Sequence, residues 1–432
     1  MAQRNARTTN GATTTNGAHQ DARIHWSDIV HTGPGTLAGR YLRTFWHPIY
    51  RAQDLPPGRA KPIKIMGEKF TLYRGEGAAA HVVAFRCAHR GTQLSTGWVE
   101  GDNLRCFYHG WMYDGSGQCV EQPAEPEPFC QRIKIRSYPV AEYLGMIFAY
   151  LGEGDPPAMW SFPEFEGPGK LRLRSQVWPC NYFQRVENSL DHVHGAFVHR
   201  ERTNDYGLGE VPKVLGYETE YGIKEIGIRT GHIRMQHFHM PNINYRPPWA
   251  APCGDDLPDT APDPEAGAAA NLVWRVPVDD TSVASYLLDH LRPEDAERDA
   301  DQRPARQPDY KGFKDLYDAA DAVLRGEVAI EDLRGMTNMT NVEDYVSQVG
   351  QGPIAGRSDE RLGRSDVLVI LLRKLWEREL RALAEGKPLT QWHRPASGVY
   401  EVSRILHDGE QPDPELLAPA GAAMLAPHRQ GF

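Results

Sequence analysis

The sequence predicts an α+β protein with two domains: an all-β N-terminal domain, and a larger domain in which an antiparallel sheet is flanked by helices. The chain has 432 residues, enough for two hydrophobic cores of ordinary size. Its 41 Gly and 33 Pro indicate many turns, which argues against an all-helical fold. Before residue 155, apolar and polar side chains alternate as they do in strands, whereas later segments have helical spacing.

The predicted N-terminal domain spans residues 25–155. Residues 1–24, rich in Thr, Asn and Ala, predict a disordered tail without an export signal. Alternating patterns bounded by turn residues then predict the strands Lys61–Ile65, Phe70–Tyr73, His81–Phe85 and Gly145–Leu151. The Gly/Pro cluster that follows the last strand marks the domain boundary.

The predicted second domain spans residues 156–410 and mixes strands with helices. Strands are expected at Leu171–Trp178, as a pair within Gly222–Tyr245, and within Val273–His290. Helices are expected within Asn181–His199 and at Tyr310–Arg325 and Asp366–Ala384. Residues 247–271 have little periodicity and predict a surface insertion, and residues 411–432 predict a Pro/Ala-rich tail.

Two mixed pairs of metal-binding residues, Cys87-x-His89 and Cys106-x-x-His109, are separated by sixteen residues. This ligand set suits a Rieske [2Fe-2S] cluster, in which two thiolates bind one iron and two neutral imidazoles bind the other. A glycine near each pair would allow the tight loops that such a cluster requires. The alternative is a structural zinc site, but zinc modules usually keep Cys and His in separate pairs or use four Cys. The pairs therefore favour an electron-carrying cluster.

A second metal site is predicted between residues 188 and 199. Asn188, Asp191 and His194 recur with i, i+3 spacing, which predicts that they share one face of a helix. His199 needs a further bend, which Gly195 makes plausible by weakening the helix after His194. Two His and one carboxylate form the facial triad that binds ferrous iron in oxygenases, so a carboxylate is required from elsewhere in the chain.

Composition excludes several partners. The net charge of −9 argues against nucleic acid, and no stretch approaches the roughly 20 apolar residues of a membrane span. A cytoplasmic protein is therefore expected. Because no Gly-x-Gly-x-x-Gly follows a strand, this chain is not expected to bind a nicotinamide itself, and a separate reductase is expected to supply its electrons directly or through a ferredoxin.

These motifs resemble those of the oxygenase (alpha) subunits of Rieske non-haem iron oxygenases, a family of ring-hydroxylating dioxygenases and aromatic O-demethylases. The resemblance covers about residues 25 to 400, and the family motif Asn-x-x-Asp-x-x-His-x-x-x-x-His is matched without a gap. It implies a helix-grip catalytic domain in which His194 and His199 bind a mononuclear Fe(II). It also implies that Cys87, His89, Cys106 and His109 bind the [2Fe-2S] cluster.

The third iron ligand follows from the phthalate dioxygenase and vanillate demethylase branch of the family. In that branch an Asp lies eight residues before Gly-Pro-Ile, which is followed by Arg-Ser-x-Glu-x-Leu-Gly. Asp344 has this relation to Gly352-Pro353-Ile354 and to residues 357–363, with Glu343 as the adjacent competitor.

The resemblance also implies an assembly and a reaction. Asp191 is expected to connect His194 of one subunit to His109 of the next in a head-to-tail homotrimer, and Asn188 is expected to share its role in catalysis. The implied reaction is O-demethylation of a bulky, methoxylated, biphenyl-like aromatic acid of lignin type. The alternative within the family is phthalate-type ring dihydroxylation.

Two further expectations stay open at the level of the sequence. A substrate carboxylate would favour Arg in the pocket, and the first candidates are Arg229 and Arg234 on the expected strand pair. A different class of function is a Rieske electron carrier without oxygenase activity, and a zinc-dependent binding protein is a third option. The electron carrier gives His194, His199 and Asp344 no role, and a visible cluster spectrum would exclude the zinc protein.

Overall fold

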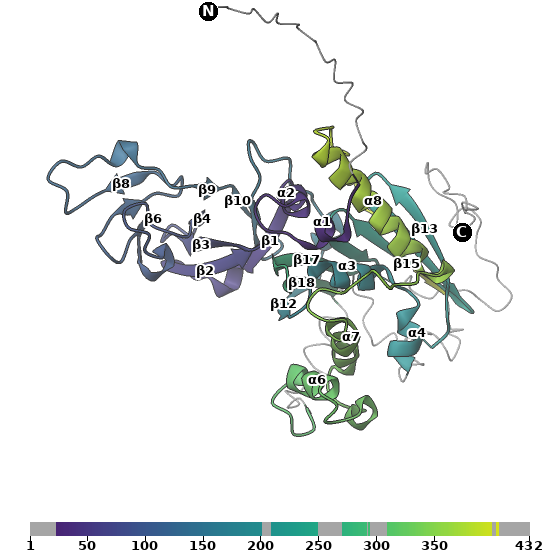
Figure 1. Cartoon of the computed structure of the whole chain (residues 1–432). Coiled ribbons are helices and arrows are strands. Elements are labelled where there is room, and N and C mark those ends of the chain that lie inside the picture. Colours follow the sequence, from purple (N-terminus) through teal and green to yellow (C-terminus); the bar gives the residue numbers. More distant parts are fainter. Residues whose placement is uncertain are drawn as a thin grey trace, which may run out of the picture.

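The computed structural model describes residues 23–200, 209–248, 270–291, 293, 309–399 and 403–405. Apart from residues 23 and 24, the two expected tails lie outside these ranges, as do residues 249–269 of the expected insertion. Figure 1 shows an elongated molecule, with small sheets at one end and a large sheet covered by helices at the other. In the described part of the chain, no helix has the length and apolarity needed to cross a membrane.

Three antiparallel sheets form the N-terminal part, with the strand orders β1-β11-β10, β2-β3-β4-β9 and β5-β6-β7-β8. The strands expected before residue 155 are confirmed as β2, β3, β4 and β11. The elements are α1 (Trp26–Val30), α2 (Leu37–Leu42), β1 (Trp46–Arg51), η1 (Ala52–Asp54), β2 (Arg59–Ile65), β3 (Glu68–Arg74), β4 (Ala80–Ala84), η2 (Leu94–Thr96), β5 (Trp98–Glu100), β6 (Asn103–Arg105), β7 (Met112–Tyr113), β8 (Cys119–Glu121), η3 (Cys130–Arg132), β9 (Ser137–Tyr138), β10 (Val140–Tyr143) and β11 (Met146–Tyr150).

One large sheet forms the C-terminal part, with the order β12-β18-β17-β16-β15-β14-β13 and with β19 paired to β15. The expected strand pair within residues 222–245 is confirmed as β14 and β15, and a third strand, β16, follows it. The strands are β12 (Lys170–Trp178), β13 (Lys213–Thr219), β14 (Gly222–Arg229), β15 (His232–His239), β16 (Ile243–Arg246), β17 (Ala270–Asp279), β18 (Ser282–Leu291) and β19 (Arg404–Ile405).

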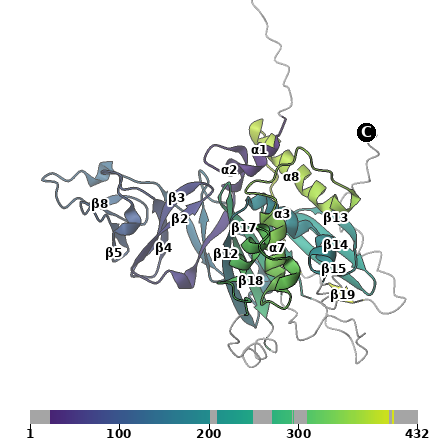
Figure 2. The same cartoon turned by 60° about the horizontal axis from the view of Figure 1, so that its bottom comes forward.

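Helices pack on this sheet and beyond its edges, as Figure 2 shows from a second direction. The expected helix at 366–384 is confirmed as α8, whose leucine stripe at 368, 371, 372 and 375 is buried. The elements are η4 (Pro163–Phe165), α3 (Tyr182–Leu190), α4 (His194–Val198), α6 (Leu316–Leu324), η7 (Ile330–Leu333), α7 (Met339–Val349), η8 (Arg364–Asp366) and α8 (Val367–Ala384).

The turn between β2 and β3 joins the two parts of the molecule. The Met66 N–H donates to the Pro277 carbonyl at 2.8 Å, and the Gly67 N–H donates to the Val278 carbonyl at 2.9 Å. Nearby, Lys64 Nζ lies 2.6 Å from Asp279 Oδ2. The N-terminal sheets are therefore tied to the β17–β18 hairpin of the large sheet. The exact domain boundary at residue 155 stays a prediction.

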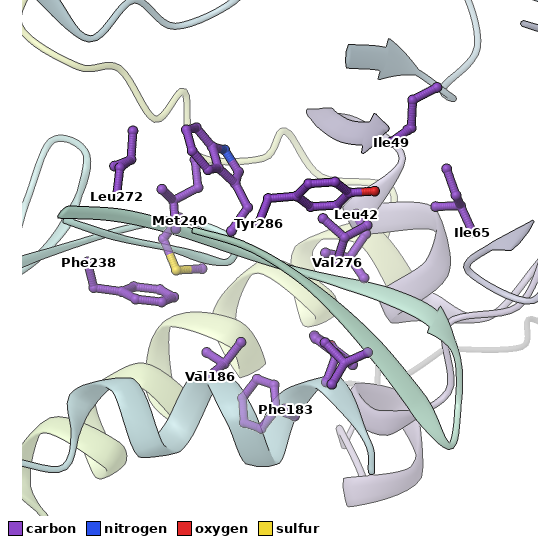
Figure 3. Close-up of a cluster of buried hydrophobic side chains, with 14 of the residues drawn as sticks. Leu42, Ile49, Ile65, Phe183, Val186, Phe238, Met240, Leu272, Val276 and Tyr286 are labelled. Carbon is purple, nitrogen blue, oxygen red and sulfur yellow. The ribbon is translucent and has the colours of Figure 1, made fainter. Parts of the chain in front are cut away.

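Helix α3 lies along one face of the large sheet. In Figure 3, Phe183 and Val186 point from this helix towards the strands, while Leu272 and Tyr286 lie on the opposite side of the sheet. The start of α3 is fixed by Asn181, whose Oδ1 accepts from the Phe183 N–H and whose Nδ2 donates to the carbonyls of Val30 and Asp280. This packing holds the segment that follows α3 in a fixed position.

The single helix face expected for residues 188–194 is wrong. Helix α3 ends at Leu190, and Asp191 has the extended values φ −90° and ψ 101°. A second short helix, α4, starts at His194. The bend therefore lies before His194. Gly195, which was expected to cause a bend just after His194, is instead buried inside α4.

Candidate metal centres

The two Cys/His pairs lie in loops with the same hydrogen-bond pattern. The Cys87 N–H donates to the Thr92 carbonyl at 2.8 Å, and the Gly91 N–H donates back to the Cys87 carbonyl at 3.0 Å. In the second loop the corresponding bonds run from Cys106 to Trp111 at 2.8 Å and from Gly110 to Cys106 at 3.1 Å. Both glycines have positive φ, +75° and +73°, a conformation that most other residues adopt only with strain. The sequence therefore repeats one loop design to present each pair.

Within these loops the cysteines are buried and the histidines are partly exposed. The imidazole rings of His89 and His109 lie 4.5 Å apart, and His89 stacks on Trp111 at 4.6 Å. Nδ1 of His89 is buried without a hydrogen-bond partner among the described residues, which suits a metal ligand. No three ligand atoms of this set meet within 4.8 Å, as the ligands of one tetrahedral zinc would. The residues therefore fit a two-iron cluster better than a single ion.

Tyr113 adds a polar contact to this centre that the sequence did not reveal. Its hydroxyl oxygen accepts from the Ala88 N–H at 3.2 Å and lies 3.2 Å from Cys87 Sγ. Burial, followed by the interaction with Cys87, raises the pKa of Tyr113 well above its ordinary value. The phenol thus stays protonated and can donate to the sulfur.

We expect Tyr113→Phe to lower the reduction potential of the cluster by about 40 mV. A hydrogen bond to sulfur stabilises the more negative, reduced cluster, and a bond worth about 1 kcal/mol corresponds to this shift for one electron. Redox titration of the visible spectrum measures the shift. Tyr73→Phe is the matched control, since that buried hydroxyl donates to the Asp102 carbonyl instead. An unchanged potential in Tyr113→Phe would remove this role.

The structure brings His194, His199 and Asp344 together from separate elements. His194 begins α4, His199 directly follows it, and Asp344 lies in the middle of α7. Asp344 Oδ1 is 3.7 Å from Nε2 of His194 and 3.6 Å from Nε2 of His199. These are the only three His, Cys, Asp or Glu side chains in the described ranges whose ligand atoms all meet within 4.8 Å. The donor set matches a facial triad; that these residues bind iron stays a prediction.

The electrostatics of this group favour a cation. Burial opposes a charge on His199, but Asp344 and Glu343 outweigh it and raise the pKa of His199 to about 9. Burial likewise opposes a charge on Asp344, but His199, His194 and Arg185 lower its pKa to about 2. The carboxylates of Asp344 and Glu343 therefore create a negative potential at the imidazole of His199.

Asn188 and Asp191 approach the two nitrogens of the same imidazole. Asn188 Nδ2 lies 3.5 Å from Nε2 of His194, whereas Asp191 Oδ2 lies 3.9 Å from Nδ1 of His194. Asp191 Oδ1 also accepts from the backbone N–H groups of Val193, at 2.8 Å, and His194, at 3.0 Å. Asp191 thus fixes the start of α4, and its side chain remains 35% exposed.

Glu343, the competitor of Asp344, contacts the other side of His199. Its Oε2 lies 2.8 Å from Nδ1 of His199, and its side chain is only 5% exposed. Asp344 instead faces both Nε2 atoms, so the two adjacent acids have different positions. A carboxylate on the second ring nitrogen fixes the tautomer and orientation of a ligating imidazole.

We expect Glu343→Ala to weaken iron binding by about 10- to 100-fold, because removal of such an orienting carboxylate has this typical effect. Iron retention against a chelator, followed by metal analysis, measures the change. Glu331→Ala, an exposed acid of η7 on the same side of the molecule, is the control. Equal retention by both variants would contradict the orienting role.

An ion-pair cluster anchors the last turn of α3. Glu187 is buried and pairs with Arg357 and with Arg373, whose Nε lies 2.6 Å from Glu187 Oε1. Glu360 pairs with the same two arginines. The Arg-Ser-x-Glu motif after Gly-Pro-Ile therefore connects α3 to α8 and has no contact with the metal site.

Sequence reasoning missed two features of this region. Helix α7, which carries Glu343 and Asp344, was not predicted, although Val342, Tyr345 and Val349 have the spacing of a buried helical face. A hollow of about 810 Å³ between α4, η7 and α7 borders Glu343, but none of the three predicted iron ligands lines it.

Arg229, proposed from the sequence for substrate binding, has a structural role. Its Nε donates to the Glu210 carbonyl at 2.8 Å, and its Nη2 donates to the His192 carbonyl at 3.1 Å. Arg229 thus holds the chain just before His194.

Comparisons with known proteins agree with these features. The model of the Rieske [2Fe-2S] domain matches residues 45–139, which include both Cys/His loops. The tert-butanol monooxygenase / tert-amyl alcohol desaturase oxygenase subunit of Aquincola tertiaricarbonis is 32% identical over 83% of this chain and 76% of its own. The 5,5'-dehydrodivanillate O-demethylase oxygenase subunit of Sphingobium sp. is 28% identical over 83% of this chain and 80% of its own.

A solved structure shares the fold. The NdmA QL mutant of Pseudomonas putida CBB5, solved with theobromine, aligns with a TM-score of 0.58 and 22% identity. The alignment covers 86% of this chain and 98% of that chain. Both the small sheets and the helix-covered large sheet therefore belong to a known architecture, which confirms the α+β fold expected from the sequence.

Proposed function

Because the chain belongs to the Rieske non-haem iron oxygenases, as a terminal oxygenase subunit, we propose that it oxygenates an aromatic acid at an iron held by His194, His199 and Asp344. The observation that carries the proposal is the convergence of two imidazole Nε2 atoms on one carboxylate oxygen, at 3.6 and 3.7 Å. His194, His199 and Asp344 would hold the ferrous ion, which would supply the activation of O2.

The electrons are proposed to come through the cluster bound by Cys87, His89, Cys106 and His109. Both cartoons place the β5–β8 sheet at the end of the molecule remote from α3 and α7 (Figures 1 and 2). A donor cluster in a neighbouring subunit fits this separation, and it supports the head-to-tail homotrimer. Trp98, Phe107 and Tyr108 beside the cluster are 51%, 59% and 54% exposed, which suits a surface that docks.

In such a trimer Asp191 is proposed to connect His109 of one subunit to His194 of the next. Its exposed carboxylate lies beside the unpartnered Nδ1 of His194, which supports a contact across the interface. Electrons from NADH would reach the cluster through a separate reductase, with or without a ferredoxin. A cytoplasmic location stays a prediction.

O-demethylation of a methoxylated aromatic acid is the reaction we favour. The two relatives are named for O-demethylation and for monooxygenation of tert-butanol, and each reaction inserts one oxygen atom at a saturated carbon. In O-demethylation, O2, two electrons and two protons convert a methoxy C–H to a hemiacetal and release water. The hemiacetal then collapses to a phenol and formaldehyde. Ring dihydroxylation, the alternative, would leave both oxygen atoms on the product as a cis-diol.

Product analysis tests this proposal. Purified protein is incubated with a reductase, NADH, and a panel of methoxylated biphenyl and benzoic acids and phthalates. We expect formaldehyde and the phenol in equal amounts from a methoxylated acid. A cis-diol without formaldehyde would contradict demethylation and assign ring dihydroxylation to the enzyme.

Iron content separates the oxygenase from an electron carrier. A cluster together with a mononuclear site holds three irons per chain, whereas a carrier holds two. We expect about three, with acid-labile sulfide at two per chain. Two irons in fully loaded protein would favour the carrier.

A further inference from the structure

Two arginines on neighbouring strands of the large sheet face the same side. Arg246 lies opposite Asn271 in the β16–β17 pairing, and Asn244 lies opposite Val273. Because side chains alternate along a strand and directly paired residues share a face, Arg246 and Arg275 both project towards the face on which α3 lies. Leu272, which alternates with Asn271 and Val273 along β17, lies on the side of the sheet away from α3 (Figure 3). The two guanidinium groups therefore lie on the side of the sheet that α3 covers.

A third arginine reaches this space from α3 itself. The guanidinium of Arg185 stacks over the Trp178 ring at 3.5 Å, and its Nη1 donates to Gln348 Oε1 at 2.7 Å. Gln348 Nε2 in turn donates to Asp344 Oδ1 at 3.3 Å. One amide therefore separates this guanidinium from the predicted iron ligand.

None of the three arginines has a carboxylate within ion-pair distance in the described part of the chain. Arg275 Nη1 donates to Ser285 Oγ at 2.6 Å, and Arg246 Nε donates to Gln236 Oε1 at 3.0 Å, so both partners are neutral. By contrast, Arg172 and Arg174 at the far edge of the same face share Asp289. The arginines at the edge are paired, and those near the metal site are not.

The three positive charges also act on one another. Burial lowers the pKa of Arg275 well below its ordinary value, and the nearby charges of Arg185 and Arg246 lower it further. Asp344 opposes this effect, but it is a single carboxylate and also faces two histidines. Burial raises the pKa of Glu225, another acid on this face, to about 8, which weakens its negative charge near neutral pH, and Asp289 is already paired with Arg172 and Arg174. An excess of positive charge therefore remains.

Several polar atoms on this face are buried without a partner among the described residues. They are Arg185 Nε, Arg275 Nε, Gln176 Nε2 and Asn244 Oδ1. Arg185 and Arg275 are only 3% and 5% exposed. Buried donors of charged groups are almost always hydrogen-bonded in folded proteins. Three unpaired donors and one unpaired acceptor, Asn244 Oδ1, gathered on one face therefore indicate a site for a polar ligand.

We propose that Arg185, Arg246 and Arg275 bind the carboxylate of the substrate beside the iron triad, so that the enzyme selects organic anions over neutral aromatics. The inference rests on the proposed function and deepens it by naming the substrate charge and the residues that recognise it. Arginine suits this task because its planar fork donates two parallel hydrogen bonds to a carboxylate. Arg229 is no longer a candidate, since it is held by two backbone carbonyls, whereas Arg234 stays a prediction.

Calorimetric titration of the iron-loaded protein with matched pairs of ligands tests the proposal. Vanillate is compared with vanillamide, and phthalate with phthalamide, because each amide has nearly the shape of its acid but no charge. We expect at least one acid to bind about ten-fold or more tightly than its amide, as a charged hydrogen bond predicts. Equal or weaker binding of both acids, including no binding, would overturn the proposal.

Variants then show which arginines cause the tighter binding of acids than of amides. In Arg246→Gln/Arg275→Gln we expect acid and amide to bind with similar affinity, whereas Arg174→Gln, whose arginine is paired to Asp289, should keep the wild-type preference. If the double variant lacks the cluster spectrum, Arg275→Lys decides, since it keeps the charge but loses the fork and should reduce the preference. A preference unchanged in these variants would assign the arginines a structural role.

The outcomes for this proposal and for the oxygenase proposal differ. Formaldehyde release from vanillamide as efficient as that from vanillate, with three irons per chain, would refute anion selection and leave the oxygenase intact. Acid binding that depends on Arg275, with two irons per chain and no product, would support the anion site and refute the oxygenase proposal.

Discussion

His199→Ala is expected to lose one of three irons per chain and to lower product formation by about a thousand-fold or more. His199 supplies one of only three ligands that converge at the predicted triad, and its Nε2 lies 3.6 Å from Asp344. A catalytic metal contributes several kcal/mol to transition-state stabilisation, which corresponds to this factor. The Rieske spectrum should not change, because the Cys/His loops lie in separate sheets.

Metal analysis and the visible spectrum together measure this result. His393→Ala is the control, since that exposed histidine lies far along the chain and outside both centres. If His199→Ala kept three irons and its activity, the triad would be wrong. If it lost the cluster as well, the variant would be misfolded, and Asp344→Asn would be the variant to examine next.

Asp191→Asn is expected to keep both metals and to slow reoxidation of the reduced cluster, in the presence of O2 and substrate, by about 100-fold. Asn retains the Oδ1 acceptor for the backbone of Val193 and His194, so the start of α4 should persist. It loses the negative charge beside Nδ1 of His194, and a change of this kind next to a metal ligand typically costs 10- to 100-fold in activity. Stopped-flow spectroscopy of the prereduced protein measures the rate.

Mixed trimers show whether this transfer crosses between subunits. A His109→Ala chain lacks a complete cluster, and a His194→Ala chain lacks a complete triad, so each alone should be inactive. Coexpressed chains should recover part of the activity if each cluster serves its neighbour. No recovery in trimers shown to contain both chains would mean that electrons pass within one subunit. Full coupled turnover in Asp191→Asn would remove that residue from the path.

The elements that the sequence predicted well are those whose signals are local. Strands with alternating side chains, such as β2 to β4, and the leucine stripe of α8 each follow from a few neighbouring residues. The glycines beside the Cys/His pairs likewise have the positive φ that a tight loop requires. The prediction of Asp344 as an iron ligand came from the resemblance of the sequence around it to a family motif. Helix α7 places Asp344 beside the two histidines.

The errors arose where distant parts of the chain decide the local structure. The break between α3 and α4 cannot be read from the i, i+3 spacing, because the hydrogen bonds of Asp191 to its own backbone compete with the helix. Arg229 was a reasonable candidate by residue type, but a carbonyl group before His194 holds it. Arg185, Arg246 and Arg275 could not be grouped from the sequence, since only the register of the sheet and the position of α3 bring them together.

The unpartnered polar atoms beneath α3 affect how the protein tolerates heat. A fold that leaves Arg185 Nε and Arg275 Nε without partners gives up stability that an anionic ligand can restore. A ligand present at 100 times its dissociation constant adds about 2.7 kcal/mol to the free energy of unfolding. The melting temperature should then rise with substrate supply, so that a cell without substrate holds the more labile form of the enzyme.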